Sequence, residues 1–415
     1  MQPAGSANLI TNRNLRLLII GQLISAIGDH FYLLAMPWLA LQLTRSALVA
    51  STVLAAASVP RALLLLVGGV ATDRYSARLT LIMANGLLAV VMAGLGATTL
   101  AQFTPLWFLY ALALVAGVAD AFAYPAVNSL LPGIVQSDDL ETGNIFLQGT
   151  FMVSGVVGPA LAGLLISLFG SSAAEQSSLI GIGLAFLIDS ATYVIGIALF
   201  WQMQVAASEA NPDESIISSL GYVFDEIKAD PRFRYLFLMI LALGLLLTGS
   251  ITVGLPVLAV ARLPGGAAVL GFLTAAYGAG MLGGMAGLKF VPKPPAAISG
   301  LVVLAVFAVF PVGLMVLGVT ALTPLAITTL LTMGAANGYV TIYVLSWLQR
   351  KTPVHMLGRI MGVVMFAIIG LAPVSQIVIG YLLDLDIEKT FVGAGALVLL
   401  LLLATATRRE MWSLD

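Results

Sequence analysis

Apolar segments of about 20 residues follow one another along most of this chain, separated by short polar stretches. A segment of that length crosses the hydrocarbon core of a bilayer as an α-helix. This rule predicts helices over residues 15–43, 47–70, 79–103, 106–131, 143–170, 178–203, 233–260, 267–289, 296–319, 322–349, 356–383 and 390–407. We therefore expect an all-α integral membrane protein with twelve transmembrane helices.

The composition favours the same class of protein. Of the 415 residues, 60% are hydrophobic and only 9% are charged, whereas about 25% of the residues in a soluble domain are charged. The 18 Lys and Arg residues nearly balance the 19 Asp and Glu residues, which argues against nucleic acid as a partner. The chain has no cysteine, so disulfides, thiolate metal sites and cysteine nucleophiles are excluded.

The two halves of the chain resemble each other. Matching pairs 217 residues apart are Gly117 and Gly334, Ser129 and Ser346, Gly163 and Gly380, while Pro37 and Pro256 match at 219. The longest polar segment, 204–232, separates the halves and is either an amphipathic helix on the membrane surface or a solvated linker. We expect two pseudo-symmetric six-helix bundles, 1–203 and 233–415, joined by a cytoplasmic linker, as in many secondary transporters.

The basic residues are unevenly distributed between the two sides of this topology. Fourteen lie on the side of the termini and three, Arg45, Arg262 and Lys389, on the other, while Arg61 is the remaining one of the 18. Lys and Arg favour the cytoplasmic side of a membrane. Both termini are therefore expected in the cytoplasm of a multi-pass protein of the plasma membrane, which in a bacterium is the inner membrane.

Four charged residues lie far from any predicted helix end: Asp29, Arg61, Asp120 and Asp189. All four are in the first half of the chain. A charge at bilayer depth costs about 2.5–3.5 kcal/mol on insertion scales, and such residues usually face a cavity or a partner. This asymmetry between the halves is the main indication of a functional site.

Polar residues recur at helical spacing on two of the predicted helices. Gln22, Ser25, Asp29, Tyr32 and Met36 share one face of the first helix, and Gly117, Asp120, Tyr124 and Asn128 share one face of the fourth. Lipid would penalise such faces, so we expect both to face a water-accessible interior. The residues expected to line a substrate cavity are Gln22, Ser25, Tyr32, Met36, Tyr124, Asn128, Gln148, Tyr277, Asn337, Thr341 and Tyr343.

The intramembrane charges suggest proton coupling. Burial disfavours the ionised form of a carboxyl group, and a nearby cation favours it. We hypothesise that Asp29 or Asp120 binds and releases a proton, with Arg61 as the alternating partner. The alternative is a static ion pair that only fixes helix packing. For Asp189 a structural hydrogen bond is the alternative to coupling, and His30 is expected to serve packing rather than proton transfer.

Residues 68–78, Gly-Gly-Val-Ala-Thr-Asp-Arg-Tyr-Ser-Ala-Arg, resemble the signature of the loop between the second and third helices of the major facilitator superfamily. Gly69, Asp73, Arg74 and Arg78 match it, whereas Ser76 and Ala77 depart from it. The resemblance implies that the aspartate caps a helix N-terminus across a cytoplasmic gate, where a carboxylate is favoured. It also implies that the basic residues lock an outward-facing state.

One other segment resembles a subgroup of that superfamily, the exporters of macrolide and enterobactin type, and another resembles a motif of proton-driven exporters. Gly28 and Asp29 precede an apolar-Pro-Trp-Leu run, as in that subgroup. Residues 154–163 resemble the antiporter motif of proton-driven exporters at Gly158, Pro159 and Gly163, which implies close helix packing. The arginine common in the fourth helix of proton-coupled relatives is absent, because Ala113 occupies its expected position.

These observations predict a secondary active transporter that works by alternating access. Proton-coupled export, by antiport, of an amphiphilic drug, siderophore or metabolite is the first interpretation. An uptake carrier or a lysolipid transporter with the same fold is the alternative. An enzyme is disfavoured, since no phosphate-binding loop, nucleophile elbow or histidine-rich metal motif appears. We expect a monomer in membrane lipid, with protons and a small molecule as partners and no cofactor or metal.

Overall fold

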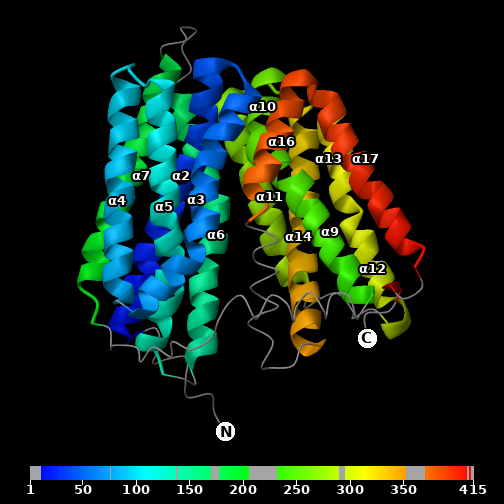
Figure 1. The fold of residues 1–415 in the computed structure, drawn as a ribbon, viewed down its shortest axis with the longest axis horizontal. Helices are drawn as coiled ribbons and strands as arrows, with labels where there is room; N and C mark the ends of the chain where they lie inside the picture. The colour runs from blue at the N-terminus through cyan, green and yellow to red at the C-terminus, as the bar shows by residue number, and fades with distance from the viewer. Residues whose placement is uncertain are drawn as a thin grey trace. The chain divides into compact units, whose positions relative to one another are not determined.

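The structure is a computed structural model that describes residues 11–74, 76–136, 139–169, 177–204, 231–288, 295–351, 370–408 and 411–412. All regular secondary structure in these ranges is helical (Figure 1). Within these described ranges, eleven helical stretches are long and apolar enough to cross a membrane. Of the predicted span 356–383, the structure describes only the second part, as helix α16 (Ala372–Leu385). Residues 352–369 lie outside the described residues. The expected all-α membrane architecture is confirmed.

The chain forms two compact units. Unit 1 comprises Met1–Thr44, Val53–Pro212 and Gly265–Ala275, and unit 2 comprises Arg45–Thr52, Asp213–Pro264 and Ala276–Asp415. The domain boundaries derived from the sequence stay a prediction. Most of the expected linker, 205–230, lies outside the described residues.

Apart from residues 45–52, unit 1 contains the helices of the first half of the chain, which run beside one another in Figure 1. They are α2 (Arg13–Thr44), α3 (Ala47–Arg74), α4 (Ala77–Leu100), α5 (Leu106–Leu130), α6 (Leu140–Leu168) and α7 (Ser177–Trp201). Helix α7 packs on α2 and α4, and α2 also packs on α6. Leu18, Leu130 and Phe200 are fully buried at one end of this bundle. Ser190 of α7 donates a hydrogen bond to the carbonyl of Ala89 in α4 over 2.8 Å.

Apart from residues 265–275, unit 2 contains the helices of the second half of the chain. Two of the spans predicted there are interrupted. The helices are α9 (Pro231–Gly249), the π-helix η3 (Ser250–Gly254), α10 (Leu255–Ala261), α11 (Gly266–Gly287), α12 (Ser299–Phe307), α13 (Val309–Val319), α14 (Thr323–Lys351), α16 and α17 (Ile387–Ala406). The predicted span 233–260 runs from α9 through η3 into α10, and 296–319 is divided into α12 and α13 at Ala308. Helix α9 packs on α16, and α13 packs on α17.

Two helices are divided between the units, which the sequence did not indicate. Helix α3 begins in unit 2, and its part from Val53 onward belongs to unit 1. Helix α11 begins in unit 1, and its part from Ala276 onward belongs to unit 2. In each half of the chain, therefore, the second helix starts within the other half's unit.

The start of α3 is fastened to the end of α16 within unit 2. The Asp384 carboxylate accepts hydrogen bonds from the Ser46 hydroxyl at 2.6 Å and from the backbone N–H groups of Ala47 at 2.6 Å and Leu48 at 3.1 Å. One turn earlier, a Cβ on Gly380 would lie 2.1 Å from the Ser51 hydroxyl oxygen, so only glycine permits this approach. Asp384 thus satisfies backbone donors that a helix N-terminus leaves free.

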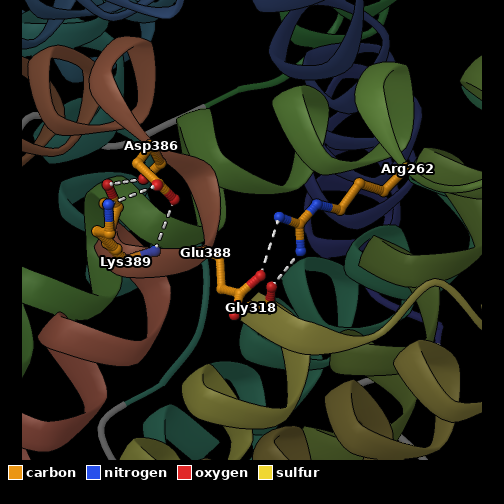
Figure 2. A network of polar contacts seen from close by, with 6 residues as sticks. Arg262, Gly318, Asp386, Glu388 and Lys389 are labelled. Atoms are coloured by element: carbon orange, nitrogen blue, oxygen red, sulfur yellow. Dashed lines mark hydrogen bonds and ion pairs between the residues drawn. The ribbon is translucent and has the colours of Figure 1, made fainter.

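A polar cluster joins three other helix ends of unit 2 (Figure 2). Arg262, which follows α10, donates to the carbonyl of Gly318 near the end of α13 and pairs with Glu388 in the first turn of α17 at 3.5 Å. Asp386, the N-cap of α17, accepts a hydrogen bond from the Lys389 backbone N–H at 2.9 Å and pairs with the Lys389 ammonium group at 3.2 Å. These contacts, the backbone hydrogen bond foremost, hold the pKa of Asp386 below its usual value.

Candidate functional site

A cavity of about 260 Å³ lies within unit 1. We call it the charged pocket. It is lined by Gln22, Ser25, Ala26, Asp29, His30, Tyr32 and Leu33 of α2, Arg61 of α3, Leu81, Asn85, Leu88 and Met92 of α4, Asp120, Ala123, Tyr124 and Val127 of α5, Phe151 and Ser154 of α6, and Tyr193 of α7. All six helices of the first half therefore contribute to one cavity.

The charged pocket brings together most of the residues that the sequence pattern selected in the first half. Asp29, Arg61 and Asp120 line it, as do the predicted cavity residues Gln22, Ser25, Tyr32 and Tyr124. The spacing of polar residues on α2 and α5 therefore indicated which faces these helices turn toward each other.

Three predicted cavity residues of the first half do not line the charged pocket. Met36 is fully buried in the packing of α2. The Asn128 side chain is exposed and donates to the carbonyl of Tyr124 over 2.9 Å. Gln148 of α6 is also exposed. The prediction from helical spacing therefore included residues of α2 and α5 that share a helix face with the cavity residues but lie beyond the cavity.

Asp29 has a partner that the sequence analysis missed. The Tyr193 hydroxyl of α7 donates a hydrogen bond to Asp29 Oδ1 over 2.5 Å. Tyr193 lies four residues after Asp189, so both residues share one face of α7. That spacing was the available signal, but nothing in the sequence indicated that this face of α7 meets α2.

Arg61 has no ion-pair partner within the part of the chain that the structure describes. Among the described residues no ion pair joins it to Asp29 or Asp120, and its buried Nε has no hydrogen-bond partner there. The static ion pair considered from the sequence is therefore not formed. The guanidinium group instead lines the same cavity as the two carboxylates.

Asp189 is sealed beside the charged pocket and does not line it. Its side chain is fully buried, and within the described part of the chain its Oδ2 has no hydrogen-bond partner. Its Oδ1 accepts only a long hydrogen bond, 3.4 Å, from the Thr192 hydroxyl. A Cβ on Gly28 would lie 2.5 Å from that same oxygen, so Asp189 packs directly against the backbone of α2 next to Asp29.

The residues of the antiporter-like motif make two close contacts within unit 1. A Cβ on Gly158 would lie 2.7 Å from the Cβ of His30, so this glycine makes room for the imidazole side chain at the charged pocket. A Cβ on Gly163 would lie 2.7 Å from the Cα of Gly271 in α11, and one on Gly271 would lie 2.4 Å from the carbonyl oxygen of Pro159. The motif thus allows α2 and α11 to approach α6 closely.

The expected cytoplasmic gate is only partly described. Gly69, Asp73 and Arg74 belong to the last turns of α3, but the side chains of Asp73 and Arg74 lie outside the described residues. Arg78 donates to the carbonyls of Phe200, at 3.0 Å, and Trp201, and its guanidinium carbon lies 5.9 Å from the centre of the Trp201 ring. A cation at the C-terminus of α7 is favoured by the helix dipole.

A second cavity, of about 380 Å³, lies within unit 2. We call it the apolar pocket. It is lined by Ile240, Leu243, Gly244, Leu247 and Thr248 of α9, Tyr277 of α11, Phe307 and Phe310 of α12 and α13, and Asn337, Val340, Thr341, Val344, Leu345 and Leu348 of α14. The predicted cavity residues Tyr277, Asn337 and Thr341 are included. Tyr343 is not, and its ring stacks on that of Tyr339 at 5.8 Å.

No group of three or more His, Cys, Asp or Glu side chains within the described ranges is placed to hold a metal ion. The chemistry available in the charged pocket is therefore that of its carboxyl, guanidinium, imidazole, phenol and amide groups. Carboxyl groups can bind and release protons, and the other groups can orient them.

Comparisons with known proteins give a family and a fold. The model of the Major Facilitator Superfamily matches residues 18–375. The multidrug efflux pump Tap of Mycobacterium tuberculosis is 29% identical over 185 residues, which cover 43% of this chain and 44% of Tap. Macrolide efflux protein A of Streptococcus pyogenes is 26% identical over 161 residues, which cover 39% and 40%. The matches span less than half the length of these curated relatives.

Solved structures share the architecture at low identity. The nucleoside transporter NupG superposes with a TM-score of 0.72 at 13% identity, covering 95% of this chain and 98% of that chain. A POT family transporter in complex with 5-aminolevulinic acid superposes with a TM-score of 0.73 at 11% identity, covering 95% and 96%. Similarity at this level establishes the fold alone.

Proposed function

This chain belongs to the Major Facilitator Superfamily, whose members are transporters rather than enzymes, and on that premise we propose that it is a proton-coupled exporter. It works by alternating access and exchanges protons for an amphiphilic small molecule such as a drug, a siderophore or a metabolite. The names of two relatives, a multidrug efflux pump and a macrolide efflux protein, favour export. They match only part of the chain, so the direction and the substrate class are part of the proposal.

The charged pocket is the observation that carries the proposal. With both carboxylates ionised, Asp29, Asp120 and Arg61 together carry one net negative charge, and one bound proton brings this sum to zero. A net charge inside an apolar helix bundle is costly. Binding or loss of that proton can therefore shift the equilibrium between conformations of a transporter.

The contacts suggest a role for each charged group. Tyr193 holds one oxygen of Asp29, and Asp29 lines the cavity, so its other oxygen is the proposed proton acceptor. Asp120 is a second acceptor in the same cavity. Because Arg61 is ion-paired with neither of them, it can stabilise whichever carboxylate is ionised. Asp189 packs against Gly28 beside Asp29, so the charge state of Asp189 would also act on Asp29.

The remaining site residues complete the proposed cycle. Gly69, Asp73, Arg74 and Arg78 form the cytoplasmic gate, and Gly158, Pro159 and Gly163 provide the close helix packing of an antiporter. The protein is proposed to be a monomer in the plasma membrane with both termini in the cytoplasm. Polar groups around the charged pocket, such as Gln22 and Tyr124, are proposed to contact the polar part of the substrate.

Proton release from inside-out vesicles tests the coupling. When the vesicle lumen is acidic, we expect erythromycin or ethidium to enter and protons to leave, read as recovery of the quenched fluorescence of an acridine dye. Asp29→Asn should abolish this response, because the amide cannot bind a proton at this site. The same variant should still exchange labelled erythromycin across the membrane when no gradient is present.

Asp139→Asn is the matched control, since Asp139 lines neither the charged pocket nor the apolar pocket, and it should behave like the wild type. Full proton release by Asp29→Asn would remove Asp29 from the coupling role. If neither drug releases protons while intact cells take up a labelled nutrient or lysolipid, the alternative of an uptake carrier or a lysolipid transporter would be correct.

A further inference from the structure

The apolar pocket occupies the same place in its own set of helices as the charged pocket does in its set. On α5, the lining residues Asp120, Ala123, Tyr124 and Val127 correspond to Asn337, Val340, Thr341 and Val344 of α14, each 217 positions later. These four residues of α14 all line the apolar pocket. The spacing is the one that relates Gly117 to Gly334 and Gly163 to Gly380.

Helices α2 and α9 show the same correspondence with a spacing of 218. Gln22, Ser25, Ala26, Asp29 and His30 line the charged pocket, and Ile240, Leu243, Gly244, Leu247 and Thr248 line the apolar pocket. The π-helix η3 follows directly after these residues of α9. A π-turn contains one more residue than an α-turn, which explains why Pro37 and Pro256, beyond it, are 219 residues apart.

The two pockets differ in chemistry at these corresponding positions. Leu247 stands where the first half has Asp29, and Asn337 stands where it has Asp120. Helix α11 contributes Tyr277 and no basic residue to the lining. Among the described residues, none that lines the apolar pocket is charged. Of two cavities at corresponding positions, one therefore has ionisable groups and the other has aliphatic and aromatic walls.

We propose that the apolar pocket is a second ligand-binding site, which takes an uncharged aromatic or alicyclic group that carries a hydrogen-bonding atom. Its volume of about 380 Å³ lies in the range of small-molecule sites, which are mostly apolar with a few polar groups. The rings of Phe307 and Phe310, with centroids 6.2 Å apart, belong to its wall. A charged ligand would lose its hydration there without gaining an ionic partner.

Asn337 and Tyr277 supply the polar contacts. The Asn337 amide donates to the sulfur of Met281 at 3.7 Å and accepts from the Thr341 hydroxyl at 3.5 Å. Both contacts are long, so the amide retains hydrogen-bonding capacity for a ligand. Tyr277 adds a hydroxyl group to the same cavity. A ligand atom that accepts from one and donates to the other would be oriented within apolar walls.

This inference rests on the proposed function only in identifying the ligand as the apolar part of the cargo. Binding itself does not need the proton site, because the groups that bind protons there, Asp29 and Asp120, have neutral counterparts here. Asp29→Asn is therefore expected to lose coupled transport and to keep ligand binding. Failure of the proton mechanism and failure of this site are distinguishable for that reason.

Saturable binding of N-phenyl-1-naphthylamine, an uncharged aromatic probe, to the purified chain in lipid nanodiscs tests the site. Val340→Trp, which fills the pocket from α14, should weaken binding at least about tenfold, a change of about 1.4 kcal/mol. Leu325→Trp is the matched control on the same helix, because Leu325 is 44% exposed and outside the pocket. It should bind the probe with the affinity of the wild type.

A cysteine reporter gives an independent measurement, because the chain has no cysteine of its own. The probe should slow alkylation of Thr341→Cys by N-ethylmaleimide several-fold and leave alkylation of Ser25→Cys, in the charged pocket, unchanged. Tetraphenylphosphonium, a cation of similar apolar area, should not protect Thr341→Cys. Absence of saturable binding to the wild type, as when a lipid chain fills the cavity, would overturn the proposal. Normal binding of the probe by Val340→Trp together with no protection of Thr341→Cys would also overturn it.

Discussion

At the scale of single residues, the charged pocket depends on contacts that join positions far apart in the chain. Asp29 accepts from Tyr193, and His30 rests on Gly158. The helical spacing of Asp29, Tyr32, Asp120 and Tyr124 was sufficient to predict that they face a common interior, because residues three and four apart share a helix face. It could not identify Tyr193, since a tyrosine on an apolar helix is common.

Tyr193→Phe tests the hydrogen bond to Asp29. A donor favours the ionised form of a carboxyl group, so removing the hydroxyl should make Asp29 retain its proton to higher pH. A hydrogen bond to a charged group contributes about 1.5–3 kcal/mol. We therefore expect the midpoint of the pH profile of coupled transport to rise by about one pH unit or more.

Tyr32→Phe is the control for that shift. The Tyr32 hydroxyl belongs to the same pocket but has no hydrogen-bond partner among the described residues. Its removal should leave the midpoint unchanged. Equal midpoints for Tyr193→Phe and the wild type would show that the short contact with Asp29 has no influence on proton binding.

At the scale of helices, the sequence predicted where the membrane spans lie but not how the second helix of each half is shared. The ends of the predicted spans that fall on described residues agree with the helices to within a few residues, because runs of apolar residues bounded by polar ones determine them. The predicted start at 356 lies outside the described residues. The capping of α3 by Asp384 was not predicted. Asp384 lies at the end of a span, where a carboxylate is unremarkable, and its partner is 337 positions away.

Removal of the Asp384 cap should destabilise the protein measurably. Loss of a capping side chain costs about 1 kcal/mol, so Asp384→Ala should lower the melting temperature of this 415-residue chain by about 1 °C. Ser46→Ala in the same chain should add less than its own separate effect, because one of its two hydrogen bonds is already lost with Asp384, while the other, accepted from the Val49 backbone N–H over 3.2 Å, is not. Leu385→Ala, at an exposed neighbour of the same helix, is the control. Additive effects in the double variant would show that Asp384 and Ser46 act separately.

At the scale of the whole molecule, the duplicated architecture separates two kinds of chemistry. Titratable groups line the cavity in unit 1, and uncharged ones line the cavity in unit 2. The concentration of intramembrane charge in the first half was visible in the sequence. The matching positions of the two cavities were not, because the spacing between halves changes from 218 to 219 along the first helix of the second half, at the π-helix.

The orientation of the chain can be tested with fusions. The excess of basic residues on the side of the termini predicts that both termini are cytoplasmic. A green fluorescent protein at the C-terminus should therefore fluoresce, and alkaline phosphatase inserted between Arg262 and Leu263 should be active on the outer side. Inactive phosphatase at that position with active phosphatase at the C-terminus would reverse the topology.

By itself, the sequence determined the class of protein, the positions of the spans and the residues with unusual chemistry. These properties follow from the cost of placing polar groups in lipid, which is local and can be judged position by position. Only the tertiary structure decided that Tyr193 donates a hydrogen bond to Asp29. It also decided that Arg61 lines the charged pocket together with Asp29 and Asp120 without forming an ion pair with either, and that an uncharged counterpart of this pocket exists in unit 2. Such contacts depend on which helix faces meet, and in an almost uniformly apolar chain many helix faces are alike.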